Sequence, residues 1–165
     1  MPRVYVSVGS NVDRAVNIRA GIGALRRHYQ DVMLSAVYDT RAVGFEGDDF
    51  YNLVAGFDTN DEVHDVAARL RDIEQRRGRV RAPAGDRFVS RTLDIDMLLY
   101  DDLILNEGKL RIPRPEILEY AFVLGPLAEI AGQRLHPVLR RSFRELWQAF
   151  DRSAEPLRAV RFEWD

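Results

Sequence analysis

The sequence predicts a single domain of the α+β class, with helices packed on an antiparallel sheet. Its 165 residues are about the length of one domain, and an apolar content of 46% is enough for one hydrophobic core. Segments with the two-residue alternation of strands and segments with the 3.6-residue repeat of helices follow one another in the order β-α-β-β-α-β. That order is typical of the ferredoxin-like sandwich, which leaves the sheet face opposite its helices free to carry a site.

The first half of the chain supplies three expected strands and two helices. The strands are rich in β-branched and aromatic residues and cover residues 4–8, 32–38 and 50–57. Apolar residues recur with helical spacing from Ile18 to Tyr29, after a presumed turn at Gly9-Ser10-Asn11 and with Ser10, Asn11 or Asp13 as candidate caps. Thr59-Asn60-Asp61-Glu62 has the Ser/Thr-x-x-Glu form of a capping box and predicts the start of the second helix, with Gly78 as its stop.

The second half predicts the fourth strand and the additions to the basic fold. Residues 92–100 form the expected strand, and residues 103–105 are expected to pair with it as a short hairpin across Asp101-Asp102. Extra helices are expected after Pro115 and over residues 143–150. The intervening stretches 39–49 and 79–91 contain Gly and many charges, which indicates mobile loops.

Composition excludes several classes of function. Twenty-four basic and 26 acidic residues give a net charge of −2, which argues against a surface devoted to nucleic acid or anionic lipid. The absence of cysteine removes disulfides, Cys zinc sites and thiol nucleophiles. No apolar run approaches the roughly 18 residues of a membrane span, and the start of the chain does not resemble a signal peptide, so we expect a cytoplasmic protein.

Two aspartates in the fourth strand are the strongest sign of chemistry. Asp94 and Asp96 are two residues apart and should share one face of the strand, about 6–7 Å from each other, while Leu93, Ile95, Met97 and Leu99 point into the core. Neighbouring like charges repel, so the pair favours a bound divalent cation such as Mg²⁺, with substrate phosphates completing its ligands. The plainer interpretation, a solvated face near a strand end, stays open.

Arginines precede this pair and favour phosphate chemistry. The only lysine, Lys109, does not lie in a Gly-x4-Gly-Lys-Ser/Thr loop, so phosphate binding would fall to arginine. Arginines of suitable position lie in or beside the second expected loop: Arg79, Arg81, Arg87 and Arg91. Guanidinium groups next to two carboxylates provide what a metal–phosphate site needs, although Arg91 neutralising Asp94 is the alternative.

Aromatic and amide side chains suggest a second ligand. Phe50 and Asn52 share a face of the third strand, and with Phe122 they could stack against and hydrogen-bond a flat heterocycle. The alternative is that both phenylalanines belong to the core. Glu74 is a possible general base, although a glutamate in the middle of a helix usually faces solvent.

Several motifs in this order resemble the 6-hydroxymethyl-7,8-dihydropterin pyrophosphokinase family of folate biosynthesis. The most specific is Arg91-Thr92-Leu93-Asp94-Ile95-Asp96, supported by Glu74-x3-Gly78-Arg79-Val80-Arg81, Phe50-Tyr51-Asn52 and Ala121-Phe122-Val123-Leu124. The likeness runs from Val4 to Ala131. It implies a ferredoxin-like fold, ATP as co-substrate, two Mg²⁺ ions and transfer of pyrophosphate to the hydroxymethyl group of the pterin, with release of AMP.

The resemblance also implies roles for individual residues. Asp94 and Asp96 would hold the two magnesium ions, and Arg79 and Arg91 would act with them on the ATP phosphates. The remaining expected ATP-binding residues are Arg81, Arg111 and Arg114. Phe50 and Phe122 would sandwich the pterin, Asn52 would hydrogen-bond it and Glu74 would lie near its pocket, while residues 39–49 and 79–90 would close over the reactants.

Departures from the family pattern keep alternatives open. Arg114 stands where members usually carry a histidine, and Tyr120 stands at a common arginine position, which suggests a compensating exchange of charge. A paralogue with another pterin preference, a noncatalytic ligand-binding module and an RNA-binding sheet are the alternatives. An RNA-binding sheet would need exposed aromatic residues on its central strands. The strand expected to be central here carries Asp94 and Asp96 instead, which would repel phosphates in the absence of a metal. The expected partners are small molecules only, without nucleic acid or membrane, and the chain is expected to be a monomer.

Overall fold

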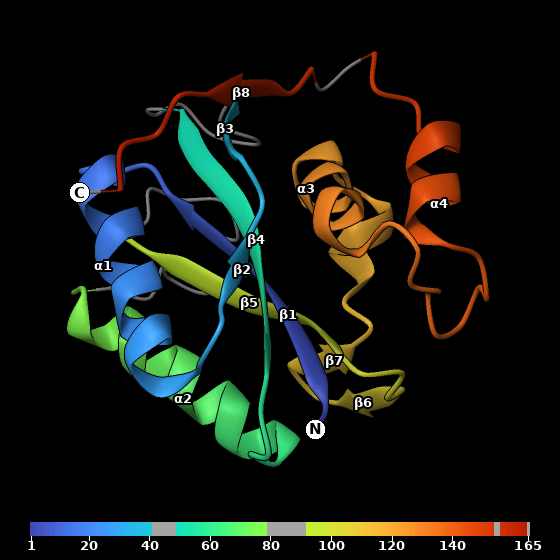
Figure 1. Ribbon diagram of the computed structural model, residues 1–165, viewed down its shortest axis with the longest axis horizontal. Helices are drawn as coiled ribbons and strands as arrows, with labels where there is room; N and C mark the ends of the chain where they lie inside the picture. The colour runs from blue at the N-terminus through green and yellow to red at the C-terminus, as the bar shows by residue number, and fades with distance from the viewer. Residues whose placement is uncertain (41–48, 79–91, 154–155, 165) are drawn as a thin grey trace.

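The computed structural model describes residues 1–40, 49–78, 92–153 and 156–164 (Figure 1). Its helices are α1 (Arg14–His28), α2 (Val63–Arg76), the 3₁₀ helix η1 (Pro115–Leu118), α3 (Ala121–Ala131) and α4 (Phe143–Ala149). Its strands are β1 (Arg3–Ser10), β2 (Met33–Leu34), β3 (Val37–Thr40), β4 (Phe50–Asp58), β5 (Asp94–Tyr100), β6 (Leu105–Glu107), β7 (Leu110–Ile112) and β8 (Arg158–Val160). Among these described elements, no helix combines the length and the apolar character that crossing a membrane requires.

The main sheet has the predicted antiparallel ferredoxin-like arrangement. Its strands follow the order β5-β1-β4-β3-β8, with β2 pairing with β4 beside this path. Strand β5, which carries Asp94 and Asp96, is therefore an edge strand, and the expectation that it is a central strand is wrong. The C-terminal strand β8, which the sequence pattern did not indicate, extends the opposite edge by pairing with β3.

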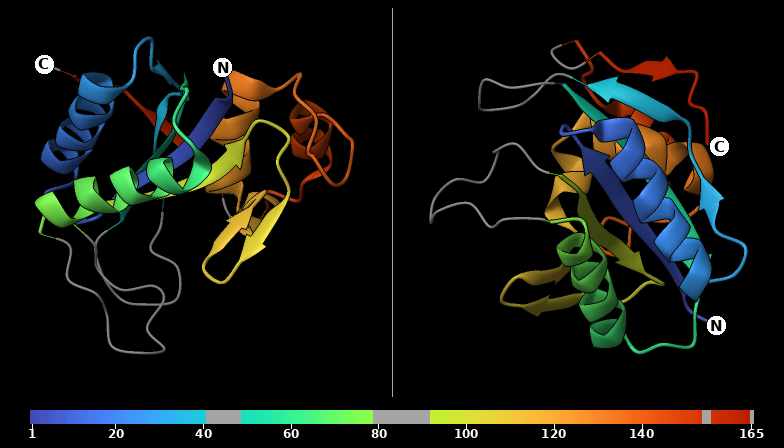
Figure 2. Two further views of the ribbon diagram at one scale, coloured as in Figure 1. Left: turned by 90° about the horizontal axis from the view of Figure 1, so that it is seen from below. Right: turned by 90° about the vertical axis from the view of Figure 1, so that its left-hand side faces the viewer.

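Helices cover both faces of the sheet, as Figures 1 and 2 show. Helices α1 and α2 cover the face that we call the first face, where Val6, Val8 and Phe57 belong to the larger hydrophobic cluster. Helix α3 packs on part of the second face, against Val54 and Leu98. The expectation that the second face is free of helices is therefore wrong. Apolar residues on both sides of β4 and β5 need cover on both faces of the sheet.

Two segments differ from the sequence-based expectation. Residues 32–38 form two short strands because Ser35 interrupts them: its N–H donates to the Val54 carbonyl and its Oγ accepts from the Val54 N–H, each at 2.9 Å. Residues 103–105 do not pair with β5. Instead, Leu105 at the start of β6 pairs with Ile112 at the end of β7, so the expected hairpin across Asp101-Asp102 is wrong and β6 and β7 form a separate hairpin.

One helix start, one strand end and one strand face also differ from the expectation. The expected capping box is wrong, since α2 begins at Val63 and Glu62 is its N-cap, accepting from the His64 N–H at 3.0 Å. Gly9-Ser10 is not a turn, because β1 continues through Ser10. A register shift between Tyr5 and Val6 ends the simple alternation along β5, so Leu99 packs in the second-face cluster. Gly78 has a φ of 76° just beyond α2, which confirms it as the expected stop.

Candidate active site

A row of three residues crosses strands β5, β1 and β4 at one end of the second face. Gly9 of β1 pairs with Asn52 of β4 on one side and with Asp94 of β5 on the other. Directly paired residues of an antiparallel sheet point to the same face, so Asp94, Gly9 and Asn52 form what we call the site row. Two inter-strand spacings place the outer members about 10 Å apart.

Gly9 permits the close approach of the side chains beside it. A Cβ at this position would lie 2.6 Å from Asn52 Oδ1 and 3.7 Å from Phe50 Cδ1. The first distance is shorter than real contacts allow, so a side chain here would displace the Asn52 amide. The prediction that Phe50 and Asn52 share a face is confirmed, and Gly9 is the residue beside them that sequence reasoning missed. A glycine inside a strand was the available signal.

Asp94 and Asp96 share a face, as predicted. They are half-buried, whereas Ile95 and Met97, which alternate with them, are buried in the first-face core. Asp96 pairs with Ser7, one step along the sheet from the site row. Further along β5, Leu98 and Leu99 lie under α3. The aspartates therefore occupy the part of the second face where its apolar cluster ends.

Arg114 brings a positive charge to this carboxylate pair. Its N–H donates to the Leu98 carbonyl at 3.0 Å, which holds the chain beside β5. Its guanidinium lies 3.4 Å from Asp96 Oδ1 and 2.5 Å from Glu116 Oε2. Burial alone would lower the pKa of Arg114, but the nearby Asp96 and Glu116 carboxylates outweigh it and raise that pKa. Arg114 therefore stays a cation that partly neutralises the acidic pair.

Glu74 supports the aspartate strand from the first face. Its side chain on α2 is 4% exposed, so the expectation of a solvent-facing glutamate is wrong. Its Oε2 accepts a hydrogen bond from the Ile95 N–H at 2.8 Å. Ile95 lies between Asp94 and Asp96 on an edge strand. The Glu74 carboxylate therefore accepts a backbone hydrogen bond that a further strand would otherwise accept. A role for Glu74 in binding substrate stays a prediction.

The expected heterocycle-binding residues come from β4 and α3. Asn52 Nδ2 donates to Thr40 Oγ1 at 2.5 Å, which fixes the amide with its oxygen over Gly9. Phe122 at the start of α3 is half-buried and stacks with Tyr120, with the two ring centres 5.0 Å apart. The structure thus gives Asn52 and Phe122 defined neighbours, and the sandwich of a ligand between Phe50 and Phe122 stays a prediction.

Only some of the predicted phosphate-binding arginines lie in the part of the chain that the structure describes. Arg79, Arg81, Arg87 and Arg91 lie outside the described residues, as does most of both expected loops. Arg111 is exposed on β7, opposite Asn106. In the described ranges no group of three or more His, Cys, Asp or Glu side chains could hold a metal. An ion at Asp94 and Asp96 would thus need ligands besides the His, Cys, Asp and Glu side chains that the structure describes.

The fold and the site row define an α+β domain that carries carboxylate, amide and aromatic groups together at one end of the second face of its sheet. A family model described as 7,8-dihydro-6-hydroxymethylpterin-pyrophosphokinase (HPPK) matches residues 5–132. The chain belongs to this family. It therefore transfers pyrophosphate from ATP to the hydroxymethyl group of a dihydropterin in folate biosynthesis.

Similar proteins agree with this assignment. A 2-amino-4-hydroxy-6-hydroxymethyldihydropteridine pyrophosphokinase of Aquifex aeolicus is 32% identical over 88% of this chain and 90% of its own length. The enzyme of the same name from Pseudomonas aeruginosa is 37% identical over 78% and 80%. The folic acid synthesis protein FOL1 of Dictyostelium discoideum is 34% identical over 82% of this chain, which is 20% of that longer protein.

Solved structures support the fold. A crystal structure of an HPPK-DHPS in complex with substrates matches 90% of this chain with a TM-score of 0.70 and 11% identity. The chain spans 43% of that protein. A Plasmodium falciparum HPPK-DHPS matches 89% of this chain with a TM-score of 0.67 and 13% identity. At such identities the likeness concerns the fold alone.

Proposed function

We propose that Asp94 and Asp96 hold the magnesium ions of the ATP complex, two in number, and that the dihydropterin binds at the Asn52 end of the site row. The observation that carries the proposal is the register of β1 with β4 and β5, which aligns Asp94, Gly9 and Asn52 on one face. A separation of about 10 Å leaves room for a phosphate chain between a metal at one end and a flat ring at the other.

The donor atoms at Asp94 and Asp96 fit magnesium. Mg²⁺ prefers oxygen ligands and commonly takes one or two carboxylates together with substrate phosphates and water. When bound at Asp94 and Asp96, the ions would supply positive charge that stabilises the negative charge developing on the phosphates during transfer. Because Arg114 lies beside Asp96, we include it in the phosphate-binding set, together with Arg111, Arg79, Arg81 and Arg91 from the sequence.

The protein's own groups would orient the second substrate. Asn52 presents its amide oxygen over Gly9, where it can accept from an N–H of the pterin, and Phe50 lies beside the same glycine. Phe122 is proposed as the second face of the aromatic sandwich, and Glu74 as a residue near the pterin pocket. Holding the hydroxymethyl oxygen in line with the β-phosphorus lowers the entropic part of the barrier. The cytoplasmic location, the monomeric state and a changed pterin preference stay predictions.

The decisive experiment combines product analysis with substitution of the acidic pair. With ATP, Mg²⁺ and 6-hydroxymethyl-7,8-dihydropterin, the wild type is expected to form AMP. Asp94→Ala and Asp96→Ala are each expected to lower kcat by roughly 100-fold or more, because charge stabilisation during phosphoryl transfer is lost. Asp72→Asn, an exposed acid paired with Arg76 on α2, is the matched control and should keep wild-type turnover. Formation of ADP, or full activity of Asp96→Ala, would contradict the proposal.

A further inference from the structure

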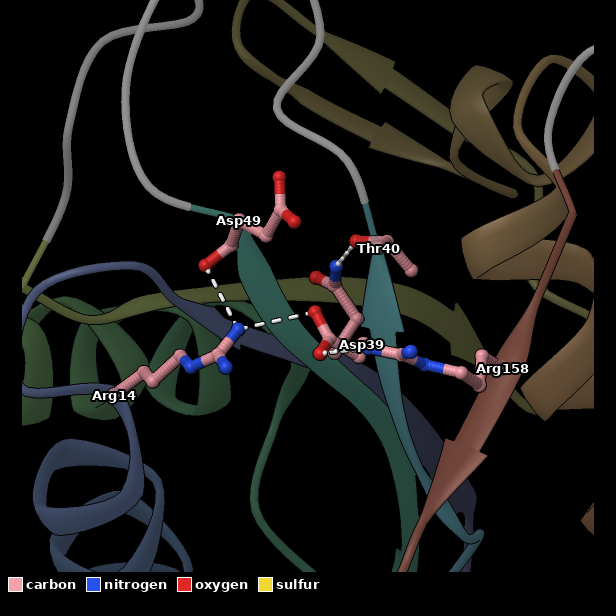
Figure 3. A network of polar contacts seen from close by, with 6 residues as sticks. Arg14, Asp39, Thr40, Asp49 and Arg158 are labelled. Atoms are coloured by element: carbon pink, nitrogen blue, oxygen red, sulfur yellow. Dashed lines mark hydrogen bonds and ion pairs between the residues drawn. The ribbon is translucent and has the colours of Figure 1, made fainter.

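A cluster of ionic side chains joins α1, β3 and β8 (Figure 3). Asp39 at the end of β3 is bound through both carboxylate oxygens. Arg14 Nη1 of α1 lies 3.0 Å from Oδ1, and Arg158 Nη2 of β8 lies 2.8 Å from Oδ2. The Asp39 side chain is only 11% exposed, so these two guanidinium groups largely replace its contact with water.

Arg14 extends the cluster from β3 to the start of β4. The same Nη1 donates to the Asp49 carbonyl at 3.1 Å, and the guanidinium carbon lies 3.8 Å from the centre of the Tyr51 ring. Tyr51 pairs directly with Asp39 across the two strands. One arginine at the first position of α1 therefore contacts both strands at the point where each meets the site.

Strand alternation places this cluster on one face and the site on the other. Tyr51 packs against the first-face core, so its partner Asp39 points to that face as well. The neighbouring residues Thr40 and Asn52 point to the second face. There Thr40 Oγ1 accepts from the Asn52 amide, and this bond directs the amide oxygen over Gly9.

We propose that Arg14, Asp39 and Arg158 form a positioning cluster that fixes Thr40 against Asn52 and thereby sets the affinity for the pterin. This inference rests on the proposed contact of Asn52 with the pterin. The three residues touch neither substrate in it; they hold β3 and β4 at the spacing that the Thr40–Asn52 bond needs. It also gives the C-terminal strand a part in substrate binding, because Arg158 anchors β8 to the same carboxylate.

The cluster should act on one substrate more than on the other. Asp39→Asn keeps the size of the side chain but removes the charge that holds both arginines. We expect the KM for the pterin to rise about tenfold, because small displacements of orienting groups weaken binding strongly. The KM for ATP and kcat should stay within about twofold of wild type. Arg158→Ala should have a smaller effect, about two- to threefold, because Arg158 is 76% exposed and its ion pair is screened by solvent.

Steady-state kinetics with the full chain tests the inference, using Asn52→Ala and Asp72→Asn alongside Asp39→Asn. Arg14→Lys is a second route to the same test, since lysine keeps the charge but loses the planar group that joins Asp39, Asp49 and Tyr51. A selective rise of pterin KM in Asp39→Asn and Arg14→Lys, with Asp72→Asn unchanged, supports the cluster.

Other outcomes separate this inference from the proposed function. A raised pterin KM in Asn52→Ala together with wild-type values in Asp39→Asn and Arg14→Lys would overturn the cluster while keeping the proposed pterin site. Equal rises in the KM for both substrates with a lowered Tm would show general loosening and also overturn it. An unchanged pterin KM in Asn52→Ala would overturn the proposed pterin contact, and the inference with it.

Discussion

The two faces of the sheet differ although the same strands build both. Across the first face, β1, β4 and β5 present apolar residues to α1 and α2, as Val8, Phe57 and Met97 do. The second face is divided. Tyr5, Val54 and Leu98 pack beneath α3, whereas the other end carries the aspartate pair and the site row.

This difference shows how one sheet combines stability with chemistry. Neighbouring carboxylates and an ordered amide contribute little apolar burial, so the free energy of folding must come mainly from the other surfaces. Strand alternation lets β5 serve both purposes, with Ile95 and Met97 on one side and Asp94 and Asp96 on the other. Substitutions on the first face should therefore cost stability, and substitutions at the site should cost activity.

The sharpest test of this comparison is one truncation on each face. Phe57 is fully buried on the first face and stacks on Tyr29 with ring centres 4.0 Å apart. Phe57→Ala is expected to lower the free energy of unfolding by about 3–5 kcal/mol, through lost burial and the cavity left behind. Asp94→Asn, at the site, should change it by less than about 1 kcal/mol. Urea denaturation of both variants measures the contrast.

Two results would break the comparison. A loss of several kcal/mol in Asp94→Asn would mean that the site end of the second face also stabilises the fold. A loss below about 1 kcal/mol in Phe57→Ala would mean that the first-face core can close over the missing ring. The conservative variant Phe57→Leu should fall between wild type and Phe57→Ala, because it leaves a smaller cavity.

The elements on the first face were the most predictable from sequence. Ile18, Ile22 and Leu25 recur with helical spacing, and this local signal survives because α1 buries one side. The second face was harder. Cover by α3 depends on contacts between distant segments, and strand β8 is three residues long and pairs with β3 more than a hundred residues earlier. No short-range pattern reveals such a pairing.

The site was predictable to a similar extent. The aspartate pair and the Phe50–Asn52 pair follow from two-residue spacing, and the structure confirms each shared face. The alignment of the two pairs through Gly9 could not be predicted, because strand register depends on the whole sheet. The contact of Arg114 with Asp96 was missed for the same reason, as the two residues meet only after the β6–β7 hairpin has returned the chain.

Glu74 tests whether the first face also supports the chemistry on the second. Its carboxylate is the partner of the Ile95 N–H between the two aspartates. Glu74→Ala is expected to lower the free energy of unfolding by about 1–3 kcal/mol, because a buried donor loses its acceptor. Glu74→Gln keeps an oxygen at that place and should lose less. Thermal unfolding of the two variants, with amide exchange at Ile95, would show the difference. Equal losses in both would mean that the charge of Glu74 matters more than its hydrogen bond.

The smallest expected effect is on the pH dependence of stability, which should differ between His64 on α2 and His136 beside α4. His64 of α2 has Glu107 and Glu62 oxygens at 2.7 and 2.6 Å from its two ring nitrogens, and these bonds raise its pKa above 6.5. Burial lowers the pKa of His136, whose Nδ1 accepts from the Val138 and Leu139 N–H groups and whose ring packs edge-on against Phe143 of α4.

The two shifts have opposite consequences for stability. A raised folded-state pKa means that the contribution of His64 is complete below pH 6.5 and is lost as the pH rises through the folded value. A lowered one means that the contribution of His136 is complete above pH 6.5 and declines as the pH falls toward its folded value. The Tm advantage of wild type over His64→Gln should therefore shrink from pH 5 to pH 8, and its advantage over His136→Asn should grow. If the curves of Tm against pH for both variants ran parallel to that of wild type, neither histidine would contribute to the pH dependence of stability.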